Sequence, residues 1–208
     1  MPPKPQKSRR SQAERRAQMQ AAIMEASLAM LIEDGYSGFS ASGVAARAGV
    51  SRGAQEHYYP KKIDLIAAAT KYAMDEAESH AIEFAEAAHE STEDPIEKFL
   101  AASEDFFFMP VFMAMAEIII AARSDADLHK VVMPIISDAR DNLDRIWTET
   151  LADAGYSQER SRQFVEVTHY LMRGMFFVNT WLPYKVERGA IVKMWRELAP
   201  NLLRSPMS

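Results

Sequence analysis

The sequence predicts an all-α protein of about nine helices. From residue 11 onward, apolar residues recur at intervals of three and four, which is the period of a helix with one buried face. No stretch alternates apolar and polar residues for long enough to indicate a strand. Capping residues, glycines and prolines divide the chain into segments of helical length. Apolar residues make up 48% of the 208 positions, so the chain can bury a core of ordinary size.

Three helices are expected in the first sixty residues. The first ends at Gly35, because glycine takes the left-handed conformation that closes a helix. Two short helices follow, opened by the N-cap residues Ser40 and Ser51. A tight turn at Gly49 separates them, which gives a compact three-helix unit.

Longer helices are expected in the rest of the chain. Pro95 opens one of them, Pro110 separates two, Gly155 ends another and Pro183 stops the one after it. The expected helices cover approximately residues 11–34, 40–48, 51–58, 61–88, 94–109, 110–122, 127–154, 157–182 and 187–203.

The composition limits the class of protein. The sequence has no cysteine, which excludes disulfides and thiolate metal sites and favours a cytoplasmic location. Residues 1–16 are basic and polar and lack the apolar segment of a secretory signal. The longest apolar stretch, residues 106–122, contains Pro110 and Glu117 and is too short for a bilayer span. We therefore expect a buried pair of helices there and no membrane partner.

Charge is distributed unevenly along the chain. Residues 1–62 contain ten Lys and Arg against five Asp and Glu, whereas residues 63–208 contain fourteen against twenty-four. A basic head on an acidic body is expected where one end of a protein meets phosphates. A basic segment that is merely solvated has the same composition, so charge alone leaves both interpretations open.

The segment from residue 35 to 69 has the pattern of a helix-turn-helix. Val44 and Ala45 lie on the inner face of the first short helix. Gly49 permits the turn, and Val50 anchors the turn between the helices. The second short helix would then enter the major groove of DNA with its N-terminal residues toward the base edges.

This segment resembles the TetR family of tetracycline-repressor-like transcriptional regulators. The matching residues, at the family's spacing, are Gly35, Tyr36, Val44, Ala45, Ala48, Gly49, Val50, Ser51, Gly53, Tyr58, Tyr59, Pro60, Lys62, Asp64 and Leu65. The resemblance implies a homodimer that represses from a palindromic double-stranded operator and is released by a small effector. We accordingly divide the chain into a flexible basic arm (1–10), a helix-turn-helix DNA-binding domain (11–60) and a larger helical ligand-binding and dimerisation domain (61–208).

The resemblance also assigns residues to DNA contacts. Arg52 and Gln55 take positions that face base edges, where Arg can bind guanine and Gln adenine with two hydrogen bonds each. Tyr58 and Lys62 match positions that contact phosphate. Ser51 can also contact phosphate, through its hydroxyl or the N-terminus of its helix.

Glu56 departs from the family pattern. Many members carry an aromatic or apolar residue there, and a carboxylate would repel phosphate. Glu56 can instead accept a hydrogen bond from cytosine or pair with a nearby arginine. His57 is expected to face solvent, and Tyr59 to pack in the core.

The larger domain is rich in phenylalanine and methionine. Most of these side chains are expected to be core residues, but soft side chains at this density also suit an apolar cavity that adapts to a small hydrophobic effector. The candidate ligand-binding residues are Phe107, Phe112, Met113, Glu117, Trp147, Met172 and Phe176. Other polar residues that could orient a ligand are Arg123, His169, Arg173 and Asn179. Glu117 is preferred because it alone lies inside an apolar run.

The last two long helices resemble the family's dimer-forming pair. The candidate interface residues are Tyr170, Gly174, Val178, Trp181, Ile191, Trp195 and Leu198. Gly174 would let two helix axes approach closely. A two-fold dimer is needed because a monomer reads only one half of a palindrome.

Two other interpretations stay open at this point: an enzyme, and a helical small-molecule carrier that does not bind DNA. The sequence has no HExxH, glycine-rich phosphate loop, GxSxG elbow or cysteine nucleophile, so we predict no catalytic residue and no cofactor. His80 and His89 are nine residues apart, which does not place both on one metal ion, and no metal site is predicted. A carrier would leave the basic head and Arg52 unexplained.

Overall fold

The all-α fold is confirmed in the part of the chain that the structure describes. The computed structural model describes residues 11–90, 94–182 and 187–204, without side chains for residues 88–90 and 181. Within these ranges the helices are α1 (Gln12–Gly38), α2 (Ala41–Arg47), α3 (Arg52–Tyr58), α4 (Lys62–Glu90), α5 (Pro95–Phe108), α6 (Pro110–Ala122), α7 (Ala126–Asp153), α8 (Gln158–Trp181) and α9 (Arg188–Arg204). Their bounds agree closely with those expected from capping and periodicity.

Helix α1 differs most from its expected bounds, because it continues beyond the predicted stop. Ser11 caps its start in a reciprocal pair of hydrogen bonds with Glu14. Gly35 interrupts the helical backbone with φ +67°, and a further turn extends to Gly38. The predicted glycine break is therefore present, but it forms a kink inside α1 and not its end.

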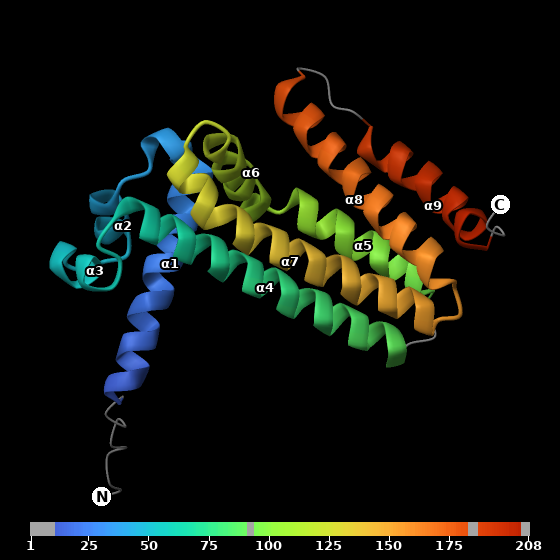
Figure 1. The fold of residues 1–208 in the computed structure, drawn as a ribbon, viewed down its shortest axis with the longest axis horizontal. Coiled ribbons are helices and arrows are strands. Elements are labelled where there is room, and N and C mark those ends of the chain that lie inside the picture. Colours follow the sequence, from blue (N-terminus) through green and yellow to red (C-terminus); the bar gives the residue numbers. More distant parts are fainter. Residues whose placement is uncertain (1–10, 91–93, 183–186, 205–208) are drawn as a thin grey trace, which may run out of the picture.

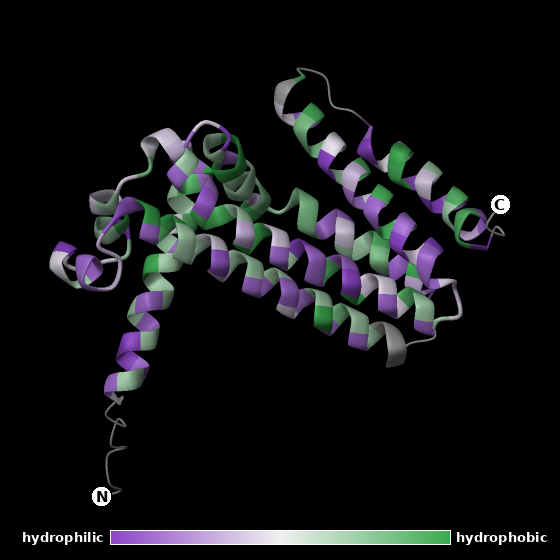
Figure 2. Ribbon diagram, in the orientation of Figure 1, coloured by the Kyte–Doolittle hydropathy of each residue, from purple (hydrophilic) through white to green (hydrophobic). Residues whose placement is uncertain are grey.

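The helices form an elongated molecule (Figure 1). Helices α2 and α3 lie at one end, α8 and α9 lie at the other, and the long helices α4 and α7 run side by side between them. Hydropathy follows this arrangement in Figure 2, where α3 is mostly hydrophilic and α6 is mostly hydrophobic.

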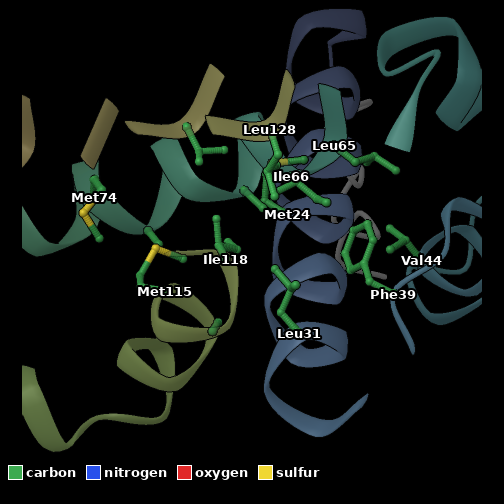
Figure 3. Packing of buried hydrophobic residues seen from close by; sticks show 14 of the residues in the cluster. Met24, Leu31, Phe39, Val44, Leu65, Ile66, Met74, Met115, Ile118 and Leu128 are labelled. Carbon is green, nitrogen blue, oxygen red and sulfur yellow. The ribbon is translucent and has the colours of Figure 1, made fainter. Parts of the chain in front are cut away.

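The largest core cluster joins the helix-turn-helix region to the larger domain. Leu31 of α1, Val44 of α2, Leu65 of α4 and Ile118 of α6 are each fully buried in it, and α7 contributes Leu128 (Figure 3). The apolar packing therefore continues across the predicted domain boundary near residue 60. Because α1 and α2 pack in the same core, a shift of α4 or α6 must also displace α1 and α2.

Two further apolar clusters lie beyond α4. One is built around Phe99 and Trp147 and joins α5, α7, α8 and α9. The other is built around Phe107, Phe112 and Met172 and joins α5, α6, α8 and α9. We refer to this last group as the phenylalanine cluster; its buried members are Phe107, Phe112, Ala116, Met172, Met175, Phe176 and Val192.

Among the described helices, none alone combines the length and apolar composition of a bilayer span. Helices α5 and α6 meet that test only when taken together, as a pair bent by 62°.

Candidate functional sites

Short-range hydrogen bonds fix the geometry of the helix-turn-helix. The hydroxyls of Ser40 and Ser51 accept from the backbone N–H three residues later and so cap α2 and α3. Between the helices, Gly49 has φ +67°, and the N–H of Val50 donates to the carbonyl of Ala45 at 3.0 Å. Val44 is fully buried and holds α2 against the core. The two helices are thus held at a defined angle, with the outer face of α3 exposed.

Arg52 presents a cation on that exposed face. Its side chain is 75% exposed, and its Nε donates to Oε1 of Glu56 one turn later at 2.6 Å. Of the two roles expected for Glu56, pairing with a nearby arginine is the one observed. The hydrogen bond to Glu56 and the negative charge of that carboxylate raise the pKa of Arg52. The pair restricts the guanidinium at the N-terminal end of α3, and it would offset repulsion between the carboxylate of Glu56 and a phosphate.

Gln55 does not lie on that face, which corrects its assignment as a base reader. Its side chain is 0% exposed and its Nε2 donates to the carbonyl of Tyr59 at 2.7 Å. Its Oε1 is buried and has no hydrogen-bond partner within the described structure. Because a fully buried amide cannot reach a base edge, Gln55 is a core residue that closes the last turn of α3. His57 is exposed, as expected.

The residues predicted to contact phosphate surround α3, with different degrees of exposure. Ser51 is exposed, and Tyr58 is half-buried with the guanidinium of Arg16 5.1 Å from its ring centroid. Lys62 turns inward, where its Nζ donates to the carbonyl of Tyr36 at 3.1 Å. Burial lowers the pKa of Lys62. Phosphate contacts by these residues stay a prediction.

Tyr59 packs against the core cluster, which confirms its expected role. Burial raises the pKa of its phenol.

Glu117 lies at the contact between α6 and α1 and not in the phenylalanine cluster. Its Oε2 accepts from the backbone N–H of Tyr36 at 3.2 Å. A Cβ at Gly35 would lie 3.0 Å from the same oxygen, so glycine is favoured there both by φ and by this close approach. The hydroxyl of Tyr36 also donates to Asp125, the N-cap of α7. Glu117 therefore joins the two parts of the molecule, and its assignment as a pocket residue is wrong.

The other candidate ligand residues fall into two groups. The phenylalanine cluster contains Phe107, Phe112, Met172 and Phe176, with Met113 packed at its edge. The rings are in direct contact: Phe112 lies 4.9 Å from Phe107 and 4.7 Å from Phe176, centroid to centroid, and both pairs are edge-on.

Trp147 lies instead in the neighbouring cluster, against Phe99. The structure thus separates it from the other candidate ligand residues.

His169 and Asp144 form a buried polar pair beside the phenylalanine cluster. Nδ1 of His169 lies 2.7 Å from Oδ1 of Asp144, and the imidazole packs against Phe99 and Phe107. Burial lowers the pKa of His169, although the bond to Asp144 opposes that effect. Burial also opposes ionisation of Asp144, but the hydrogen bond with His169 and the charges of Arg140 and Arg173 outweigh this effect and lower its pKa. A neutral imidazole beside an ionised carboxylate is the resulting state near neutral pH.

Helices α8 and α9 leave an apolar face in solvent. Tyr170 is 54% exposed and Val178 is also exposed on α8, with the exposed Gly174 between them, and Leu198 is exposed on α9. No atom lies within 4 Å of a Cβ added at Gly174, so a second helix can come close there. We refer to this surface as the α8–α9 face; sequence analysis missed two of its exposed residues, Val167 and Met194.

Trp195 is not part of the α8–α9 face, which corrects its assignment. Its ring stacks on Phe164 at 5.5 Å and 9°, and its Nε1 donates to the hydroxyl of Thr168 at 2.9 Å. It therefore joins α9 to α8 within one chain. Ile191 packs at the edge of the phenylalanine cluster, and the side chain of Trp181 lies outside the described residues.

No group of three or more His, Asp or Glu side chains suited to a metal ion occurs in the described ranges.

Comparison with known proteins gives matches in sequence and in fold. Residues 23–69 match the family described as "Bacterial regulatory proteins, tetR family". The HTH-type transcriptional regulator CymR of Pseudomonas putida is 30% identical over 174 residues, which cover 83% of this chain and 85% of CymR.

Solved structures resemble the fold along most of the chain. A putative TetR-family transcriptional regulator from Mesorhizobium loti has a TM-score of 0.70 at 13% identity, covering 91% of this chain and 96% of its own. The multidrug binding protein EbrR, complexed with imidazole, has a TM-score of 0.60 at 18% identity, with 91% and 97% covered.

Proposed function

This chain belongs to the TetR family of bacterial regulatory proteins, a family of DNA-binding transcriptional regulators and not of enzymes, and from that premise we propose that it is a dimeric repressor released from its operator by a small apolar effector. The single observation that carries the proposal is the exposed guanidinium of Arg52, held by Glu56 on the outer face of α3.

Helix α3 is the proposed reading element. Arg52 stands at its N-terminal end, the end that points at base edges when such a helix lies in the major groove. Its guanidinium would bind the O6 and N7 atoms of a guanine, while Ser51, Tyr58 and Lys62 hold phosphates. Arg16 and the exposed His57 lie close by and add to the same surface.

The α8–α9 face is the proposed dimer interface. It is apolar, exposed and interrupted by Gly174, which favours close packing with a second copy of the same two helices. The face lies at the opposite end of the molecule from α3 (Figure 1). The distance between the two reading helices would therefore depend on the whole length of each subunit.

The phenylalanine cluster is the proposed effector site. It lies beside the bend between α5 and α6, and α6 carries Glu117 to the backbone of Tyr36. A ligand that displaces Phe107 or Phe112 would shift α6 and, through Glu117, the end of α1. That shift would change the spacing of the two α3 helices and release the operator. The structural neighbour EbrR has been solved with imidazole, malachite green and ethidium, which supports the proposal that this chain also responds to a small molecule.

A selection of bound sequences from a random DNA pool tests this function directly. We expect a palindrome with guanine at an equivalent position in each half-site. Affinity for the selected site should fall with salt, with a log–log slope of about −0.9 per phosphate contacted. A protein that selects no sequence, or whose binding to every DNA is independent of salt, would contradict the proposal.

A further inference from the structure

Tyr36 makes polar contacts with three helices besides its own. It follows the kink at Gly35, where α1 changes direction. Its backbone N–H donates to Oε2 of Glu117 on α6 at 3.2 Å, and its hydroxyl donates to Oδ2 of Asp125, the N-cap of α7, at 3.3 Å. Its carbonyl accepts from Nζ of Lys62, the first residue of α4, at 3.1 Å. One residue therefore joins α1 to α4, α6 and α7.

Aromatic rings also hold the ammonium group of Lys62. Its Nζ lies 4.3 Å from the ring centroid of Tyr36 and 5.7 Å from that of Phe39. Both distances are within the range of about 6 Å at which the face of a ring attracts a cation. Phe39 is 3% exposed and packs in the largest core cluster, so its ring is fixed in place. One carbonyl and two rings therefore restrict the end of a long side chain that would otherwise move freely.

The charge of Lys62 is not neutralised by a carboxylate. Among the described residues none forms an ion pair with it, and Asp125 acts on its pKa through charge alone, against the larger effect of burial. Asp64, the acidic residue of the same turn, accepts instead from the backbone N–H of Lys61 at 3.0 Å. The carbonyl of Tyr36 takes one of the three N–H donors of the ammonium, which leaves two for an anion.

The ammonium lies close to the proposed reading helix. Helix α3 ends at Tyr58, and only residues 59–61 separate it from Lys62. The start of α4 and the whole of α3 lie at the same end of the molecule (Figure 1). Under the proposed function, the anion that this end meets is the DNA backbone, and the acceptor for the two remaining donors is a phosphate oxygen.

We infer that Tyr36 is a positioning residue for operator binding, because its ring and carbonyl hold the ammonium of Lys62 where the group can donate to a phosphate. A lysine side chain that is already restricted loses less rotamer entropy when it binds DNA. Since Glu117 and Asp125 in turn hold Tyr36, a shift of α6 or α7 would displace the ammonium from the phosphate. This inference rests on the proposed function, for which it names a further residue and a route of control.

Operator binding without effector tests the inference, measured by fluorescence anisotropy over a range of salt concentrations. The slope of log affinity against log salt is about −0.9 per phosphate contacted, so Lys62→Met should reduce its magnitude by about 1.8 in a dimer with two copies of the contact. Tyr36→Leu removes the ring and keeps Lys62. It should lower operator affinity by about five- to thirtyfold for the two copies together.

A double substitution separates positioning from a merely structural role. In the Lys62→Met background, Tyr36→Leu should change operator affinity by less than about twofold, because the group that it positions is already absent. Tyr36→Phe keeps the ring and the backbone carbonyl and loses only the bond to Asp125. It should bind the operator within about twofold of the unsubstituted protein, which rescues the effect of the leucine.

Matched controls come from α4. Tyr72→Leu removes a half-buried tyrosine that packs against the same core cluster, and Lys71→Met removes an exposed lysine that is paired with Asp75. Neither should change the salt slope or the operator affinity. Urea denaturation shows which variants are folded. If Tyr36→Leu does not fold, Tyr36→Met replaces it, since an unbranched side chain adapts to the space that the ring leaves.

Three results would overturn the inference. The first is an unchanged salt slope in Lys62→Met, which needs no change in the core. The second is an equal loss of affinity from the ring-removing variant with and without Lys62, and the third is a loss in Tyr36→Phe as large as in that variant. If the unsubstituted protein still selects an operator, only this inference falls, whereas a protein that binds no DNA sequence contradicts the proposed function itself.

Discussion

The carboxylate of Glu117 on α6 accepts a hydrogen bond from the backbone N–H of Tyr36, 81 residues earlier in the chain, at 3.2 Å. This bond lies directly beside the kink at Gly35 and links the helix that flanks the phenylalanine cluster to the end of α1. It is the polar contact between α6 and α1 through which we propose that a change at the effector site reaches the helix-turn-helix.

Replacing Glu117 should weaken both stability and communication. In Glu117→Ala the N–H of Tyr36 loses its partner, and the free energy of unfolding should fall by about 1–3 kcal/mol. Operator affinity should then respond less to effector. Urea denaturation and DNA titrations with and without ligand measure the two effects. Glu149→Ala, at an exposed α7 ion pair, is the control and should change neither. A full effector response in Glu117→Ala would exclude this contact as the link.

Replacing Arg52 should relax the reading of one base pair in each half-site. Arg52→Ala should cost about 1–3 kcal/mol at the selected operator and much less at sequences changed at that base pair. Fluorescence anisotropy on a set of single-base operator variants measures this. Arg145→Ala, on α7, serves as the control. An equal loss on every sequence would show that Arg52 contacts only phosphate.

Replacing Gln55 should alter stability and leave sequence preference unchanged. Gln55→Ala removes a buried side chain and leaves the carbonyl of Tyr59 without its donor, so the free energy of unfolding should fall by about 1–3 kcal/mol. The order of preference among operator variants should match that of the unsubstituted protein. If that order changes at a single base pair, the side chain must leave the core when DNA binds.

A charge on the α8–α9 face should separate the subunits. Val178→Glu and Leu198→Glu would each place a carboxylate in a contact between identical apolar surfaces, and light scattering should show monomers at micromolar concentration. Operator affinity should fall with dimerisation. Ile82→Glu is the matched control, because Ile82 is an exposed apolar residue of α4. A dimer that persists in both interface variants would place the interface elsewhere.

Because of His169, the free energy of unfolding should decrease as the pH falls below about 6.5, the ordinary pKa of histidine. Its folded pKa lies below the ordinary value of 6.5, so between those two values the unfolded chain binds a proton that the folded chain does not. The free energy of unfolding should therefore fall by up to about 1.4 kcal/mol per pH unit over that range. Asp144 also has a lowered pKa. Its contribution to the free energy of unfolding is present above pH 3.8 and is lost as the pH falls further, through the folded pKa of Asp144.

Urea denaturation of the unsubstituted protein and of His169→Gln, each at pH 7.5 and pH 5.5, isolates the contribution of His169 to the pH dependence of stability. The variant should be less stable at pH 7.5 but lose less stability on acidification. An unchanged pH dependence would mean that another group is responsible.

Local signals predicted the helices and the helix-turn-helix because they act over a few residues. Ser40, Ser51 and Gly49 each fix a cap or a turn, and the structure confirms all three. The burial of Gln55 could not be predicted from polarity, since a glutamine on a seven-residue helix is expected to be exposed.

The remaining corrections depend on contacts between distant segments. Glu117 looked like a pocket residue because its neighbours are apolar, but its partner is a backbone N–H on α1. Trp195 has the spacing of an interface residue, but its ring stacks on Phe164 and its Nε1 donates to Thr168 of the same chain. Periodicity gives the apolar side of a helix without saying which neighbour covers it.

The core that runs from Val44 through Leu31 and Leu65 to Ile118 means that the DNA-reading segment is not a detachable module. A fragment cut near residue 60 would leave Leu31 and Phe39 without the aliphatic residues of α4 and α6 that now cover them, and it should aggregate or stay unfolded in isolation. Any ligand that stabilises the larger domain should therefore also protect α1 and α2 against proteolysis, even while it lowers their affinity for DNA.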